Sequence, residues 1–142
     1  VHRQAELWNG DGTNFTFHIR CFDADRDIGA IQEGIEGKRL LLISDIRGIH
    51  FEEDGRFDKT YDQELQWKAI KRLRPERSLV KFTCPNPMVQ FYDYVPGTIL
   101  KQTFCYYGSR EVRLMIEGVP EQTQRYNAWE LYEKSVYHHE HL

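Results

Sequence analysis

Residues 41–51 read LLISDIRGIHF, and this stretch gives the first indication of the fold. The unbroken apolar run at its start predicts a buried β-strand over residues 38–43. Ile49 and Phe51 then alternate with polar neighbours, which is typical of a second strand with one buried face. A turn signal follows at residues 53–55. The stretch therefore predicts two consecutive strands of a β-rich domain.

More strands are predicted on both sides of this stretch. Residues 15–21 alternate aromatic and β-branched side chains with polar ones. The apolar positions of residues 65–73 fall out of step, so a bulged strand is favoured there, with a short helix as the competing interpretation. Pro75 ends that segment. The remaining strands are predicted at residues 80–84, 89–94, 99–107 and 112–116, the last two forming a hairpin.

Two segments have helical spacing. Isoleucines three and four positions apart predict a short helix over residues 25–36, which would begin at Asp25 or Asp27. A second helix is predicted after Pro120 and would run to about His139. One stripe of this second helix is expected to be buried against the sheets because it carries large aromatic rings. The stripe consists of Ala128, Trp129, Tyr132, Ser135 and Val136.

Length and composition are those of one domain. The chain has 142 residues, of which 40% are hydrophobic, and this is enough for a single core. We predict an α+β fold, mainly an antiparallel β barrel or sandwich closed by a C-terminal helix, with a short helix after the first strand. Residues 1–142 are expected to form a single domain, or a fragment cut from a longer protein.

Several stretches resemble known domains. Residues 41–51 look like the second-to-third strand region of phosphotyrosine-binding domains and of the third lobe of FERM domains. Residues 64–73 resemble the strand that follows in those domains, and residues 78–83 the strand after it. Residues 128–139 are similar to the closing FERM helix. The resemblance implies the pleckstrin-homology superfold, a bent antiparallel barrel capped by one helix.

The resemblance also implies a function. In these domains an extended peptide adds to the edge strand beside the C-terminal helix. Here the contacts would come from Lys81 and Thr83 on the strand and from Trp129, Tyr132 and Tyr137 on the helix. The first hypothesis is therefore a cytoplasmic interaction module, an adaptor or scaffold, that binds a partner peptide by β-strand addition.

The alternative is a phosphate-binding module. The densest basic run consists of Lys68, Lys71, Arg72, Arg74 and Arg77. It could meet phosphoinositide headgroups, phosphopeptides or RNA phosphates, although a solvated surface is the simpler explanation. The formal net charge of −3 argues against a dedicated binder of duplex nucleic acid.

No pattern in the chain predicts catalysis. There is no P-loop, dinucleotide fingerprint or nucleophile elbow. His18, His50 and acids such as Asp45 could act as acid–base groups, but no spacing selects a pair of them. We therefore predict no enzyme and no cofactor, and an enzyme of unspecified type is the third hypothesis.

The remaining polar signals predict neither a metal site nor a membrane segment. His138, His139 and His141 could bind a metal, but a frayed polar helix end is favoured, so no metal is predicted. No apolar run approaches the roughly 20 residues that span a bilayer. Three cysteines without a CxxC pair predict free, buried thiols in a reducing compartment.

Overall fold

The computed structural model describes residues 21–48, 51–56, 58–84, 88–102 and 111–141. These residues form an α+β fold that ends in a helix, which confirms the predicted class and the closing helix. Apart from Cys21, the strand predicted at residues 15–21 lies outside the described residues. The tip of the predicted hairpin also lies outside them.

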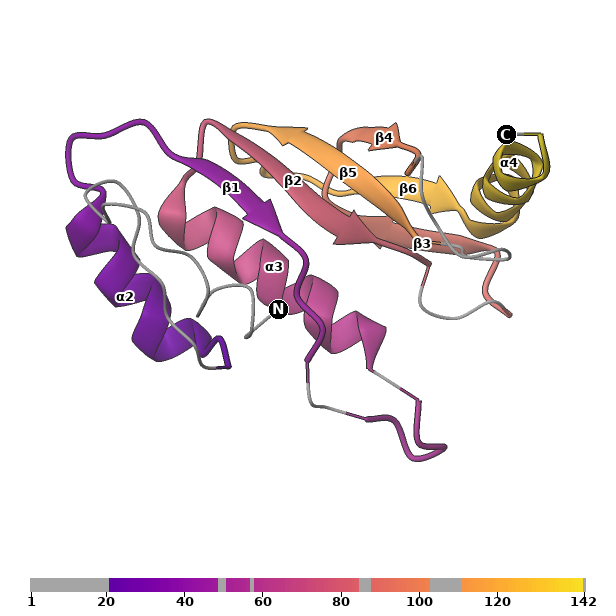
Figure 1. Ribbon diagram of the computed structural model, residues 1–142, viewed down its shortest axis with the longest axis horizontal. Coiled ribbons are helices and arrows are strands. Elements are labelled where there is room, and N and C mark those ends of the chain that lie inside the picture. Colours follow the sequence, from indigo (N-terminus) through magenta and orange to yellow (C-terminus); the bar gives the residue numbers. More distant parts are fainter. Residues whose placement is uncertain (1–20, 49–50, 57, 85–87, 103–110, 142) are drawn as a thin grey trace, which may run out of the picture.

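The main sheet has four strands in the order β1-β2-β5-β4 (Figure 1). They are β1 (Leu41–Ser44), β2 (Arg77–Phe82), β5 (Val112–Glu117) and β4 (Thr98–Leu100). β1 and β2 are parallel, whereas β5 runs antiparallel to both β2 and β4. The antiparallel pairing of the predicted hairpin strands is therefore confirmed.

The parallel pair arises from α3 (Lys59–Leu73), which connects β1 to β2. Parallel neighbours need such a crossover connection, usually a helix. α2 (Ala24–Gly34) lies beside α3 on the same side of the main sheet (Figure 1). Ala24 and Ile28 of α2 pack on Ala69 and Leu73 of α3. The predicted helix after residue 24 is confirmed, but Asp23, not Asp25 or Asp27, is its N-cap.

The prediction of a bulged strand at residues 65–73 is wrong, and the competing helix is right. α3 begins after Asp58, whose carboxylate accepts from the Tyr61 N–H, and ends at Arg74, where φ is 50° just before Pro75. Its buried face is half polar, so hydrophobic spacing did not reveal it. The buried residues are Asp62, Gln63, Gln66, Ala69, Ile70 and Leu73.

A second, two-stranded sheet joins β3 (Phe91–Tyr94) to β6 (Gln124–Asn127) in antiparallel register. Its aromatic residues pack on the inner face of the main sheet. The ring of Phe82 lies 5.5 Å from that of Tyr94 and 4.8 Å from that of Tyr126. Aromatic pairs at these distances contribute on the order of 1 kcal/mol each beyond their burial. The two sheets therefore share one core.

α4 (Ala128–Glu140) follows β6 directly and is capped by Asn127. The prediction that Trp129 and Tyr132 are buried is wrong, because their side chains are 55% and 36% exposed. The prediction is confirmed for Ala128 and Ser135, which are buried, and Leu131 between them is half-buried against the core. These three positions, spaced by three and four residues, form the inward face of α4. The side chain of Val136 lies outside the described part.

Two further predictions change with the structure. Among the described residues the two sheets do not close into a barrel, and the β1–β2 pair is parallel. One stretch that carried the resemblance to phosphotyrosine-binding and FERM lobes is a helix instead of a strand.

Cys21 is exposed, so the prediction that it is buried is wrong. Cys84 is half-buried, and burial raises its pKa to about 11.

Candidate functional site

Charged side chains from three strands meet at one edge of the main sheet. Asp45 directly follows β1, and Lys81 lies near the end of β2. Glu111 immediately precedes β5, which runs the opposite way and so begins at the same edge. Lys81 Nζ lies 2.8 Å from Asp45 Oδ1 and 3.7 Å from Glu111 Oε2. The carboxyl ends of parallel strands are a preferred place for binding sites in α/β sheets.

Two arginines complete this group. Arg113 Nη2 lies 2.9 Å from Asp45 Oδ1, and its Nη1 lies 2.9 Å from Glu111 Oε1. Arg47 Nη2 is 3.5 Å from Glu111 Oε2. We call Asp45, Arg47, Lys81, Glu111 and Arg113 the charged cluster. Its three cations and two carboxylates leave an excess of one positive charge, which favours an anionic ligand.

The polar face of α3 holds Lys81 in place. The Gln66 side chain donates from Nε2 to the Lys81 carbonyl at 2.8 Å and accepts from Ser44 Oγ at 2.9 Å. One turn earlier, Gln63 Oε1 accepts from the Thr83 N–H at 2.9 Å. Such buried amides are fully satisfied only if helix and strands keep one relative position. The backbone at Lys81 is thereby fixed, and only 16% of the Lys81 side chain is exposed.

The two carboxyl groups around this edge are shifted in opposite directions. Burial disfavours ionised Asp45, but the hydrogen bond and charge of Lys81, with the charges of Arg113 and Arg47, outweigh it and lower its pKa. Burial raises the pKa of Asp62 on α3, although its Oδ1 accepts from the Gly48 N–H at 2.8 Å. Asp45 is therefore held as a carboxylate, whereas the fold disfavours the charge of Asp62.

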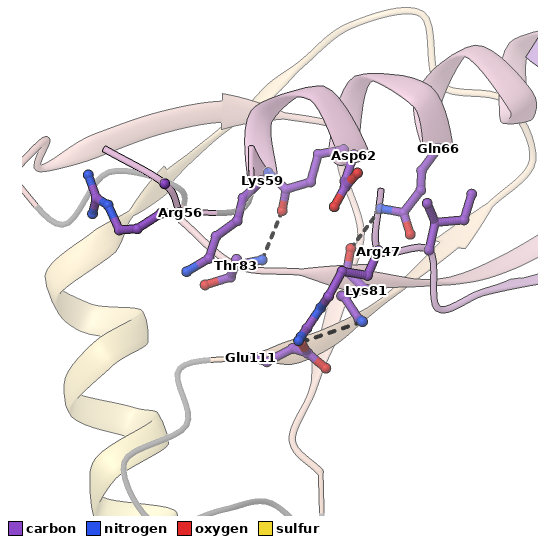
Figure 2. Close-up of a pocket in the computed structure, with 11 residues that line it drawn as sticks. Arg47, Arg56, Lys59, Asp62, Gln66, Lys81, Thr83 and Glu111 are labelled. Carbon is purple, nitrogen blue, oxygen red and sulfur yellow. Dashed lines mark hydrogen bonds and ion pairs between the residues drawn. The ribbon is translucent and has the colours of Figure 1, made fainter. Parts of the chain in front are cut away.

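Two cavities adjoin the charged cluster. The first has a volume of about 380 Å³ and is lined by Lys81, Glu111 and Asp62, among others. Figure 2 shows Lys81, Arg47 and Glu111 gathered together, with Arg56 and Lys59 farther along the cavity.

The second cavity, of about 870 Å³, is lined by Asp45 together with the rings of Phe22 and Tyr61. Ile46 and Arg47 line both cavities. Members of the charged cluster therefore line both cavities, and Arg47 is common to the two.

The predicted peptide site is not on an edge strand of the sheet. β2 pairs with β1 on one side and with β5 on the other, so it lies inside the sheet. Beyond the end of β1, the side chains of Gln66 and Gln63 bond the backbone at Lys81 and Thr83. The prediction that a peptide adds to this strand is wrong, because its backbone groups are already paired.

Three of the predicted peptide-binding residues nevertheless lie together. Thr83, Trp129 and Tyr132 line a third cavity of about 410 Å³, and Thr83 also lines the first. Tyr137 does not line it, because its ring stacks on His141 at a centroid distance of 4.1 Å. The exposed ring of Trp129 thus lines a cavity that shares Thr83 with the first cavity.

The predicted phosphate-binding run does not form one surface. Lys68 Nζ pairs with Asp25 at 2.8 Å, and Arg72 lies 3.6 Å from the same carboxylate. Lys71 lies over the Trp67 ring at 5.1 Å. Arg74 ends α3, and Arg77 lies on β2 beside Glu117 at 3.7 Å. Only Lys68 reaches a cavity beside the charged cluster, the second one, and Lys68, Lys71, Arg72 and Arg77 have local partners.

Sequence reasoning singled out Lys81 for a different role and missed the rest of the charged cluster. In the sequence Asp45 is one of several acids without an identifiable partner, and no pattern links it to Glu111, Arg113 or Arg47. The available signal was an acid directly after a buried strand. In the part of the chain that the structure describes, no three His, Cys, Asp or Glu side chains are arranged to hold a metal ion. No described helix is long and apolar enough to cross a membrane.

Comparison with known proteins gives a partial match to a curated relative and a family match. A cap-specific mRNA (nucleoside-2′-O-)-methyltransferase of Fowlpox virus (strain NVSL) is 35% identical over 79 residues. That segment is 54% of this chain and 26% of the relative, so the match spans about a quarter of the relative's length. Residues 7–141 match the family described as poly A polymerase regulatory subunit. A regulatory subunit acts on a partner protein, which agrees with the predicted protein partner. Because the match covers nearly the whole chain, this protein belongs to the poly A polymerase regulatory subunit family.

Proposed function

We propose that the charged cluster activates a ribose 2′-hydroxyl of RNA for methyl transfer. The single observation that carries the proposal is the position of Lys81, whose ammonium lies between Asp45 and Glu111: Lys81 lines the first cavity, and Asp45 lines the second. The activity printed for the Fowlpox virus relative supports the choice of reaction. The proposal departs from the sequence-based expectation of a non-catalytic module.

The cluster has the groups that such a reaction needs. The ribose oxygen would bond to the methyl carbon while the donor's methyl–sulfur bond breaks, so that the sulfonium leaves as a neutral thioether. The hydroxyl gives up its proton in the same step, and partial negative charge develops on its oxygen as the proton leaves. A fixed ammonium such as that of Lys81 stabilises this charge without reorganising in the transition state. The carboxylates of Asp45 and Glu111 hold the ammonium and offer oxygens that can accept the proton.

Two cavities suit a reaction between two molecules. RNA would occupy the cavity that contains Lys81, whose lining includes Arg47, Arg56 and Lys59 as partners for phosphates. A base could stack on the exposed Trp129 ring near Thr83.

The other cavity offers residues that fit a sulfonium nucleoside. Phe22 and Asp45 both line it: the Phe22 ring would stack on a base, and the Asp45 carboxylate would pair with a cationic donor. Such a donor supplies the methyl group when it is bound. The neighbouring residues of this chain would only hold and orient it.

The test is methyl transfer by the full chain from a labelled sulfonium donor, S-adenosylmethionine, to capped RNA. The control substrate carries 2′-deoxyribose at the first transcribed nucleotide. Label on the ribose substrate alone is the expected result. Equal labelling of both substrates, or none of either, would contradict the proposed chemistry. Loss of the signal in Lys81→Met would assign it to the cluster.

A second candidate function is binding of the partner protein through β1. Within the described part of the chain, the sheet order places β1 at the edge of the main sheet, and its Leu41 and Ile43 are 66% and 78% exposed. An apolar edge strand is a template for strand addition. This transfers the predicted β-addition from β2 to β1, with a strand of the regulated polymerase as occupant.

The variant Ile43→Lys should weaken capture of purified poly A polymerase at least about tenfold, because a charge replaces an apolar contact. The matched control is Leu100→Lys, a substitution on the opposite edge strand β4. Equal binding by both variants and the unmodified chain would exclude β1 as the interface.

A further inference from the structure

The sheet register places two cations directly opposite each other. On the antiparallel β2–β5 pair, Lys81 is the partner of Arg113. Like charges facing each other across strands are destabilising. Here the carboxylates of Asp45 and Glu111, which come from outside the strands, lie beside both cations. The repulsive pair is therefore converted into a closed ring of alternating charges.

We propose that Arg113 is a positioning residue: its guanidinium spans Asp45 and Glu111 and holds both carboxylates beside the Lys81 ammonium. The fork of an arginine can bond two carboxylates at fixed separation, which a lysine cannot. Nη2 bonds Asp45 and Nη1 bonds Glu111, each at 2.9 Å. Arg113 acts through these two groups, and its role in methyl transfer rests on the function proposed above.

Each nitrogen of the Arg113 guanidinium already has an acceptor and Arg113 lines neither cavity, so we expect no direct contact with RNA. Besides the two carboxylates, the side-chain oxygen of Gln102 accepts from Arg113 Nε at 2.9 Å when its amide is oriented to face the guanidinium. Only 22% of the Arg113 side chain is exposed. Lys81 has no comparable fork and points its single ammonium at the first cavity. Arg113 thus holds the two carboxylates, whereas the Lys81 ammonium is placed for the reaction.

The first test follows the carboxyl group of Asp45 by NMR in the full chain. The charged groups around it are Lys81 from β2, Arg113 from β5 and Arg47 from its own loop. Removing one of three cations weakens the preference for the ionised form. We expect Arg113→Gln to move the titration midpoint of Asp45 upward. The control Arg125→Gln breaks a similar pair, with Asp93 on the other sheet, and should leave Asp45 unchanged.

The second test separates positioning from charge. Arg113→Lys keeps the charge but loses the fork, so kcat for RNA methylation should fall about 10- to 100-fold while KM for RNA changes less than about threefold. Restoration of normal kcat by lysine would overturn the positioning role. If Arg113→Gln does not fold, the Asp45 titration is read in Arg113→Lys, where retained charge and a displaced carboxylate predict a smaller upward shift.

The two tests fail independently. An unchanged Asp45 midpoint in folded variants would overturn the role of Arg113, whatever the chain catalyses. If no form of the chain methylates RNA, the proposed function fails, but the NMR titration still decides whether Arg113 positions the carboxylates.

Discussion

Two groups of cations in this protein differ in how they are distributed along the sequence and in space. The basic run of residues 68–77 is the densest in the sequence, yet its members spread over α3 and the start of β2 and pair locally. The charged cluster is scattered from residue 45 to residue 113, yet each of its charged groups lies within 4 Å of an oppositely charged neighbour.

The difference shows that density in sequence is a poor guide to a site. Neighbouring residues on a helix point in different directions, and exposed charges there find nearby acids at little energetic gain. Residues at the ends of adjacent strands converge because the sheet brings those ends together. The charged cluster therefore exists because the sheet brings distant residues together, whereas the basic run is only a local excess of Lys and Arg in the sequence.

The largest expected effect is on catalysis by Lys81. Lys81→Met should reduce RNA methylation at least about 100-fold, because it removes the fixed charge that faces the attacking oxygen. The measurement is the initial rate of label transfer to RNA. Lys134→Met, which removes an exposed lysine of α4, is the matched control and should retain the full rate. Similar losses in both variants would erase the contrast between the cluster and surface lysines.

The next effect concerns the amide that fixes Lys81. Gln66→Leu should lower the free energy of unfolding by about 1–3 kcal/mol, because the Lys81 carbonyl and the Ser44 hydroxyl lose their partner. Urea denaturation would measure it. Gln32→Leu, which removes an exposed bond to the Arg72 carbonyl, should cost less than about 1 kcal/mol. Equal losses of unfolding free energy in the two variants would mean that the buried Gln66 amide contributes no more than the exposed Gln32 amide.

A smaller effect separates the two shifted carboxyls by pH. Asp45 has a lowered pKa, so its stabilisation is present above its unfolded pKa of about 3.9 and is lost as the pH falls through its folded value. Asp45→Asn should therefore lose less stability on acidification than the unmodified chain.

Asp62 has a raised pKa, so the sign is reversed: its stabilising contribution is present at low pH and is lost as the pH rises through its folded value. Asp62→Asn should lose less stability than the unmodified chain between acidic and neutral pH. Melting temperatures from pH 3 to pH 7 would test both variants. Parallel curves for the two variants would contradict the opposite shifts.

The smallest effect is expected in the basic run. Arg77→Gln breaks an exposed pair with Glu117, so stability should change by less than about 1 kcal/mol. The rate of RNA methylation should stay within about twofold. A tenfold loss of rate or of RNA affinity would return the phosphate-binding role to this run.

Some parts of the fold could be predicted because their burial is apolar. The alternation in residues 80–84 and 112–116 identified β2 and β5, whose inward residues are fully apolar except for Ser78. The isoleucine spacing identified α2. α3 was misread because Asp62, Gln63 and Gln66 occupy its buried face, where hydrophobic periodicity gives no signal.

Local periodicity encodes one-sided burial, so the α+β class and the elements that bury apolar side chains could be predicted from the sequence. Tertiary packing sets the parallel direction of β1 and β2, the outward position of Trp129, and the shared site of Asp45, Lys81, Glu111 and Arg113. These features depend on how α3 carries the chain across the sheet and on strand register. Contacts between residues more than sixty positions apart leave no trace in local spacing.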